Sequence, residues 1–164
     1  VCSSDLLWEG SCVVHEEFKG FALERLKRLH PEAAVLVHPE SPEEVLQYAD
    51  VVGSTTDLIK AVTQMPNEQF IVATDDGIFW KMHQMAPGKK LISAPTAGAG
   101  GSCESCAHCP WMGMNSLQNL EQVLISGENE VTVEPGIRDR AVRSIQRMLD
   151  FASQHHISGA LPKG

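Results

Sequence analysis

The sequence predicts an α/β protein of three layers, in which a short parallel sheet lies between helices. Short apolar runs recur along the first half of the chain, and each is followed by a polar turn and an amphipathic stretch. Strands and helices that alternate at this spacing are typical of a parallel sheet with crossover connections. The 164 residues can bury the core of one domain, or of one and a half small ones.

The first helix is expected in HEEFKGFALERLKRLHPE, where Pro31 ends it. Acidic residues come early and basic residues late, as the helix dipole favours. The apolar residues at helical spacing are Phe18, Phe21, Ala22, Leu26 and Leu29. The run AAVLVH that follows, from residue 33 to 38, has the length and composition of a buried parallel strand.

The second unit of the pattern begins with a helix in PESPEEVLQYA. We expect Ser41 to be its N-cap, Pro42 its first residue, and Glu44 the partner in a capping box. A short strand at 51–52 and a helix over about 56–65 come next.

The third unit contains a strand at 69–74, a helix in IFWKMHQM and a strand near 90–94. Small, flexible residues follow Pro95. Two helices are then expected in SLQNLEQVLIS and GIRDRAVRSIQRMLDFASQ, with a short strand EVTVE between them.

Composition excludes several classes of protein. The formal net charge of −8 argues against a general nucleic-acid binder, which needs an excess of lysine and arginine. No apolar run approaches the ~20 residues of a membrane helix, and VCSSDLLWEG lacks the basic region of a signal peptide. Five cysteines, three of them in one loop, do not suit a secreted disulfide scaffold. A cytoplasmic protein is therefore expected.

Polar residues gather where the predicted strands end. The carboxyl ends of parallel strands share one edge of a sheet, and ligands bind there. This places the residues of HPES, GST and ATDDG together, namely His38, Glu40, Ser54, Thr55 and Asp75. An imidazole two residues from a carboxylate can exchange protons near neutral pH. GST is either a helix cap or an anion cradle, and the two aspartates are interpreted as a turn without chemistry.

Three cysteines in GGSCESCAHCPWMGMN are spaced by three residues: Cys103, Cys106 and Cys109. The spacing before a proline resembles iron–sulfur ligation, although the fourth cysteine of such a run is absent. Zinc binding with His108, a redox disulfide and an inert loop stay open as alternatives. Cys12 stands alone, either as an ordinary buried thiol or as a functional one.

Several motifs occur together in order: GSCVVHEEF, VLVHPESPEEVLQYADVVGST, FIVATDDGIFWKM, CAHCPWMGMNSL and RMLDF. From about residue 7 to 151 the chain resembles the C-terminal half of type A quinolinate synthase. The resemblance implies three similar α/β domains around a pseudo-threefold axis. It also implies a transferase of NAD biosynthesis that condenses iminoaspartate with dihydroxyacetone phosphate to quinolinate, with aspartate oxidase as a possible supplier of iminoaspartate.

The resemblance further implies a [4Fe–4S] cluster held by one cysteine from each third, with an open iron as Lewis acid. On this basis Cys12 and Cys109 are expected to be cluster ligands, and Cys103 and Cys106 a possible disulfide. The implied catalytic residues are His38, Glu40 and His15. The implied substrate-binding residues are His38, Pro39, Glu40, Ser54 and Thr55.

The family's upstream half, with its third cysteine ligand, has no counterpart in the sequence, and Cys2 lies in the wrong place to replace it. We therefore expect a fragment that is inactive and holds no stable cluster alone. Expected parts are 1–11 (the end of a preceding domain, or foreign residues), an α/β domain at 12–96, the Gly-rich loop and cysteine motif at 97–114, and helices at 115–164 that would pack on the missing first domain. The alternatives are a small zinc- or redox-binding CxxCxxC module without catalytic activity, and a non-catalytic domain that binds a dicarboxylate.

Overall fold

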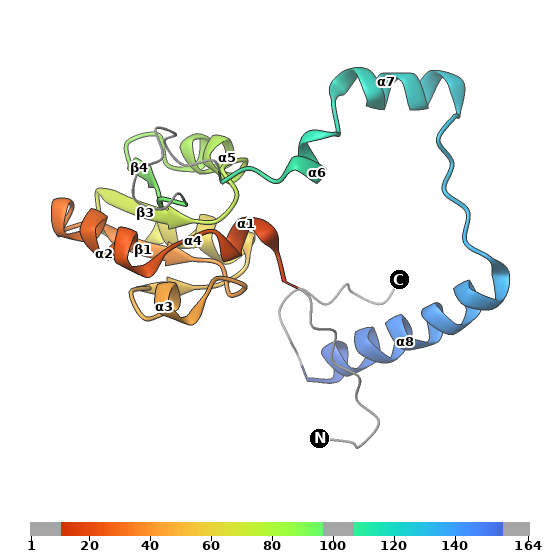
Figure 1. The fold of residues 1–164 in the computed structure, drawn as a ribbon, viewed down its shortest axis with the longest axis horizontal. Coiled ribbons are helices and arrows are strands. Elements are labelled where there is room, and N and C mark those ends of the chain that lie inside the picture. The colour runs from red at the N-terminus through yellow and green to blue at the C-terminus, as the bar shows by residue number, and fades with distance from the viewer. Residues whose placement is uncertain (1–10, 97–106, 156–164) are drawn as a thin grey trace. The chain divides into compact units, whose positions relative to one another are not determined.

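A computed structural model describes residues 11–96 and 107–155 of the chain (Figure 1). The chain divides into two units, Val1–Asn115 and Ser116–Gly164, and each is described by itself. The first unit carries the sheet and all the predicted site residues that the structure describes. Cys103 and Cys106 lie outside the described residues.

The first unit is built on a four-stranded parallel sheet in the order β2-β1-β3-β4. Its strands are β1 (Ala34–Val37), β2 (Val51–Val52), β3 (Gln69–Ala73) and β4 (Lys90–Ser93). Each strand is within a residue or two of its predicted position. Every pairing is parallel, so the four carboxyl ends share one edge. The predicted α/β class and parallel sheet are confirmed.

Alternate residues of the two central strands point to opposite faces of the sheet. On one face Val35 and Ile71 pack in a core cluster with residues of α1 (Val13–Glu16), α2 (Gly20–Leu29) and α3 (Glu43–Leu46). This explains why both strands are continuous apolar runs: each face is covered, as in other parallel sheets.

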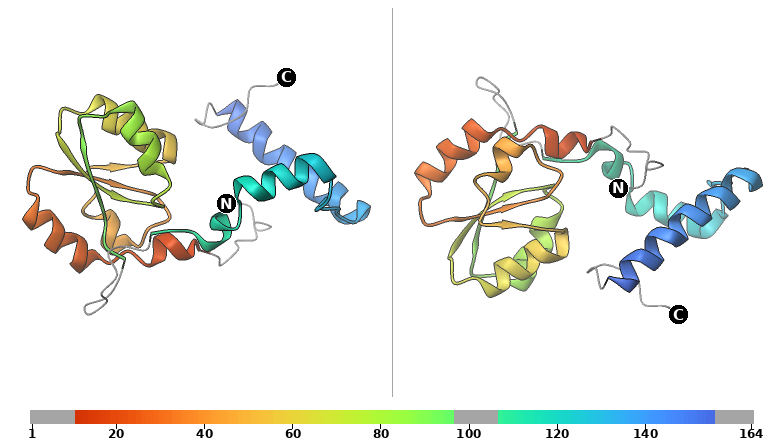
Figure 2. Two further views of the ribbon diagram at one scale, coloured as in Figure 1. Left: turned by 90° about the horizontal axis from the view of Figure 1, so that it is seen from above. Right: turned by 90° about the horizontal axis from the view of Figure 1, so that it is seen from below.

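The opposite face carries Leu36 and Phe70, which pack with α4 (Thr55–Gln64) and α5 (Ile78–Met85). Figure 2 shows α2 on one side of the sheet and these two helices on the other. The predicted three-layer arrangement is therefore present in the first unit.

The expected first helix is two helices, so this prediction is wrong in part. The chain is extended at Lys19, between α1 and α2. A Cβ atom at Gly20 would collide with the carbonyl oxygen of Glu44, so the start of α2 approaches α3 as closely as glycine allows. The break buries Phe18 but leaves Phe21 and Leu29 exposed, contrary to the apolar stripe expected of one long helix.

The predicted capping box at Ser41 is also wrong. Helix α3 begins at Glu43 with Pro42 as its N-cap, without a side-chain cap. Glu44 Oε1 accepts the Gly20 amide at 3.3 Å instead. A capping box does form at α4, where Ser54 and Asp57 exchange hydrogen bonds. The interpretation of GST as a helix cap is thus confirmed. The box expected at Ser41 does not form, because Glu44 contacts the start of α2 instead.

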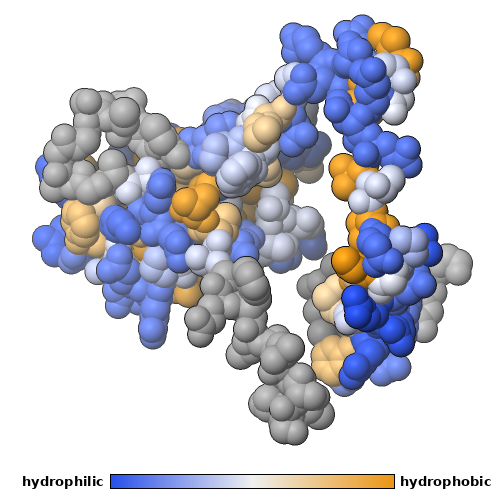
Figure 3. Space-filling model, turned by 45° about the vertical axis from the view of Figure 1, so that its right-hand side comes forward, coloured by the Kyte–Doolittle hydropathy of each residue, from blue (hydrophilic) through white to orange (hydrophobic). Residues whose placement is uncertain are grey.

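After the short helix α6 (Pro110–Gly113) the second unit contains α7 (Leu117–Ser126) and α8 (Pro135–Gln154). EVTVE is not a strand, so this prediction is wrong: the described sheet consists of β1 to β4, and the second unit has no described strand with which EVTVE could pair. Neither helix buries a side chain within the described residues. Figure 3 shows apolar patches on the surface; in this unit the most exposed apolar side chains are Leu117, Leu124, Ile125, Val131 and Met148. None of the described helices has the length and apolar character needed to cross a membrane.

Candidate functional site

The carboxyl edge of the sheet brings together the segments predicted to meet there. His38 and Glu40 follow β1, Thr55 follows β2, and Thr74 and Asp75 follow β3. The parallel register places these strand ends side by side. The edge predicted from topology alone is therefore confirmed.

Two histidines and a carboxylate form the centre of this edge. The rings of His15 and His38 stack with centroids 4.2 Å apart and planes 16° from parallel. Glu40 Oε2 lies 3.5 Å from Nδ1 of His15 and 3.4 Å from Nδ1 of His38. On its other side, His15 Nε2 lies 3.0 Å from the hydroxyl of Thr74. One carboxylate thus faces two imidazoles.

His15 is the buried member of the pair, at 6% exposure, with Thr74 at 4%. Burial lowers the pKa of His15 from its ordinary 6.5, and the neighbouring His38 lowers it further, against the opposing charges of Glu40 and Asp75. The imidazole is therefore neutral at neutral pH. Its Nδ1 makes no hydrogen bond within the described residues, since the Glu40 oxygen at 3.5 Å is near enough for an ion pair but too distant for a good hydrogen bond. A buried, unused nitrogen of this kind suits a metal or a substrate proton.

Cys12 completes a possible metal site with this pair. One ligand atom from each of Cys12, His15 and Glu40 lies within 4.8 Å of the others. Thiolate and imidazole donors favour zinc, copper and iron. Cys12 lies at the start of α1, three residues before His15, so one helical turn presents both side chains.

Cys109, the other expected ligand, is a free thiol like Cys12. Both cysteines are half-buried and pack against the core cluster that lies beneath α1. Cys109 does not join the group of Cys12, His15 and Glu40. Two thiols on one core cluster, beside a buried imidazole, fit the donor chemistry of an iron–sulfur group.

A cavity of about 350 Å³ opens at the same edge. Its lining includes Thr55, Thr74, Asp75, the ammonium-bearing Lys81 and Met112. Thr74 therefore borders the cavity, while its hydroxyl lies 3.0 Å from His15 Nε2. Sequence reasoning missed Thr74 and Lys81. Thr74 ends a predicted strand, which was the available signal for it, whereas Lys81 lies in a predicted helix to which no role was assigned.

Ser54 plays a different part from Thr55. Its hydroxyl donates to Asp57 Oδ2 at 2.6 Å and accepts the Asp57 amide at 3.4 Å. Its Oγ is thus occupied in capping α4, while Thr55 lines the cavity.

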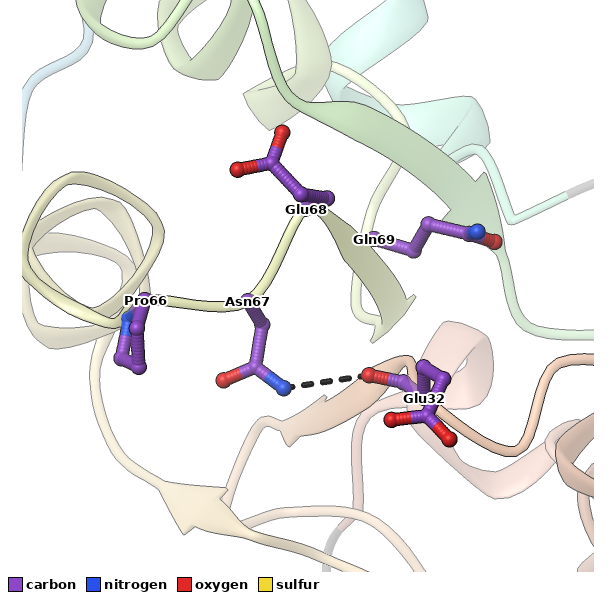
Figure 4. A pocket seen from close by; sticks show the side chains of 5 residues that line it. All are labelled: Glu32, Pro66, Asn67, Glu68 and Gln69. Carbon is purple, nitrogen blue, oxygen red and sulfur yellow. Dashed lines mark hydrogen bonds between the residues drawn. The ribbon is translucent and has the colours of Figure 1, made fainter.

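A second hollow of about 470 Å³ lies at the opposite, amino-terminal edge of the sheet. Figure 4 shows its lining, in which Asn67 Nδ2 donates to the main-chain oxygen of Glu32 at 3.1 Å. The lining residues are Glu32, Pro66, Asn67, Glu68 and Gln69. With two carboxylates and no cation, imidazole or thiol among them, this hollow does not suit an anionic substrate.

A comparison with protein families extends these observations. The family model described as quinolinate synthetase A protein matches residues 3–150, a range that includes every residue of the site. A match of this extent does not favour a small zinc or redox module. The chain belongs to the quinolinate synthetase A family, whose members are enzymes of NAD biosynthesis.

Proposed function

We propose that this chain carries the acid–base and substrate-binding groups with which a quinolinate synthase condenses iminoaspartate and dihydroxyacetone phosphate to quinolinate. The observation that carries the proposal is the stack of His15 and His38 over one carboxylate, with Cys12 within ligand distance. The reaction is inferred from membership of the family, and the residues that take part in it are inferred from the geometry of the site.

The condensation releases phosphate and two waters, so protons must move at several oxygen and nitrogen atoms. Two imidazoles 4.2 Å apart oppose each other's positive charge, and this repulsion adds to burial in lowering the pKa of His15. Glu40 lies within 3.5 Å of both rings and stabilises whichever carries the proton. His15, with its lowered pKa, is the base of the pair, and His38 is its partner.

The substrates are anionic: iminoaspartate carries two carboxylates and dihydroxyacetone phosphate carries a phosphate. The cavity is lined by Lys81, which carries an ammonium group, and by Thr55, whose hydroxyl can donate a hydrogen bond. Charge-assisted hydrogen bonds from such groups are the strong ones in anion recognition. We infer that Lys81 and Thr55 bind an anionic group, while His38 and Glu40 face the reacting atoms.

Cys12 and Cys109 are proposed as two of the thiolate ligands of a [4Fe–4S] cluster. When bound, such a cluster supplies a Lewis acid for the dehydration steps. The protein's own contribution is to hold both thiols on one core cluster and to keep His15 buried beside Cys12.

Quinolinate binding to the full chain tests the assignment of the cavity. Lys81→Met and Glu40→Gln should each change the dissociation constant measured by titration calorimetry. Losing the cation should weaken binding about tenfold or more, whereas neutralising the carboxylate should tighten binding, because it removes a charge that repels the ligand. Asn67→Ala, in the other hollow, is the matched control and should bind like the unmodified chain.

Because the chain alone is expected to be inactive, activity is measured separately with the family's upstream half supplied, as quinolinate formed from iminoaspartate and dihydroxyacetone phosphate after anaerobic reconstitution. Glu40→Gln should lower turnover although it tightens product binding. If quinolinate does not bind, or if Lys81→Met binds as tightly as Asn67→Ala, the assignment of the cavity is wrong.

A further inference from the structure

The turn after β3 is bonded to the segment that carries Cys109. The Asp76 amide donates to the carbonyl oxygen of Ala107 at 2.7 Å. Asp75 Oδ2 accepts the amide hydrogen of Cys109, also at 2.7 Å, although the two residues are 34 positions apart. Ala107 between them is fully buried in the core cluster. The segment is therefore attached to the sheet edge on both sides of residue 108.

Both oxygens of the Asp75 carboxylate are used in this turn. Oδ1 accepts the amide of Gly77 at 2.8 Å, and Oδ2 accepts that of Cys109. A carboxylate with both oxygens engaged by main-chain donors is held in one orientation. Although Asp75 lines the cavity, its hydrogen bonds suit an anchoring role better than proton transfer to substrate.

Asp76 connects the same turn to the neighbouring strand, β4. Its Oδ1 accepts the hydroxyl of Ser93 at 2.9 Å, which links the turn to the end of β4. The turn that sequence analysis left without chemistry thus joins the ends of β3 and β4 to the cysteine segment.

The main chain of Cys109 is held at both of its polar groups. Cys109 precedes α6 in an extended conformation, and its carbonyl oxygen accepts the amide of Gly113 at 2.9 Å, so this bond ties it to α6 while the bond to Asp75 ties it to the sheet edge. Its amide is held by Asp75, and its thiol packs against the core cluster that Cys12 also contacts. The direction of the thiol depends on the orientation of this main chain, and the Asp75 carboxylate is the side chain that fixes it relative to the sheet edge.

We propose that Asp75 is a positioning residue that holds Cys109 as a thiolate ligand of the iron–sulfur group, a step that rests on the proposed function. Hydrogen-bonded partners that orient metal ligands typically contribute a factor of about 10–100 to metal affinity. A negative charge close to the ligand also lowers the reduction potential of an iron–sulfur centre.

The test compares Asp75→Ala, Asp75→Asn and Cys109→Ser in the full chain. Asp50→Ala is the matched control, since Asp50 Oδ2 accepts the amide of Val35 at the same 2.7 Å, far from the cysteines in the sequence. Hydrogen exchange at the Cys109 amide is measured without iron. Iron and sulfide content and the reduction potential are measured after anaerobic reconstitution with the family's upstream half supplied, because that half carries the third cysteine ligand.

In Asp75→Ala the Cys109 amide should exchange about tenfold faster or more, the factor expected for loss of a charge-assisted hydrogen bond, and iron affinity should fall about 10–100-fold. Asp75→Asn keeps the shape and one acceptor oxygen, so it should restore part of the protection and of the iron while shifting the reduction potential upwards. Asp50→Ala should change neither measurement at Cys109. Because Asp75→Asn is nearly isosteric, it tests the proposal even if Asp75→Ala fails to fold.

Two outcomes overturn the inference, and they differ. If Cys109→Ser retains as much iron as the unmodified chain, the ligand assignment under the proposed function is wrong, and the role of Asp75 falls with it. If Cys109→Ser loses iron but both Asp75 variants keep normal amide exchange, iron affinity and potential, only the positioning role is wrong.

Discussion

Replacement of Thr74 by valine tests the buried hydrogen bond on which His15 depends. Valine has nearly the shape of threonine, so Thr74→Val removes the hydroxyl without leaving a cavity. His15 Nε2 then loses its partner at 3.0 Å, and both residues are too buried, at 6% and 4% exposure, for bulk water to replace it. A buried polar atom left without a partner costs about 1–3 kcal/mol. The free energy of unfolding should fall by that amount.

The assay is denaturant unfolding of the full chain followed by circular dichroism, in a double-mutant cycle with His15→Phe. In the His15→Phe background the Thr74 hydroxyl has no imidazole to bond with, so Thr74→Val should leave the free energy of unfolding nearly unchanged. Thr63→Val is the matched control. Its exposed hydroxyl donates to the Lys60 carbonyl oxygen, and its loss should change stability by less than about 0.5 kcal/mol.

Two results would refute this reasoning. The first is a Thr74→Val chain that is as stable as the unmodified chain. The second is an equal loss of stability in the wild-type and His15→Phe backgrounds, which would show that the hydroxyl bonds to some other group.

Three further predictions concern pH and main-chain packing. Burial and His38 lower the pKa of His15 below 6.5, so the unfolded chain binds that proton more tightly than the folded chain. The free energy of unfolding, measured by denaturation at a series of pH values, should therefore fall as the pH drops below about 6.5. The fall should be smaller in His15→Gln. Ser54→Ala removes the capping box of α4 and should cost about 0.5–2 kcal/mol in the same denaturation assay, whereas Ser54→Thr should retain most of it. Gly20→Ala should lower the melting temperature although alanine is the better helix former, because its Cβ would collide with the Glu44 carbonyl oxygen; an unchanged or raised melting temperature would contradict this.

The parts of the fold that sequence analysis predicted correctly are those that depend on neighbours along the chain. Apolar runs such as 69–74 become strands because both faces of a parallel sheet are covered. The rule that parallel strands end at one edge then places His38, Glu40 and Thr55 together without any coordinates. The errors arose where packing between distant residues overrode a local pattern. The contact of Gly20 with Glu44 accompanies the break in the first helix, and EVTVE has no described strand in its own unit to pair with.

The sequence by itself determined the α/β class, the shared edge and the family, because these depend on periodicity and on motifs read along the chain. Only the tertiary structure decided which side chains meet at that edge. His15 contacts Thr74 across 59 residues, and Asp75 holds Cys109 across 34. Such contacts depend on how helices and loops pack over the strand ends, and this packing cannot be deduced from the spacing of residues along the chain.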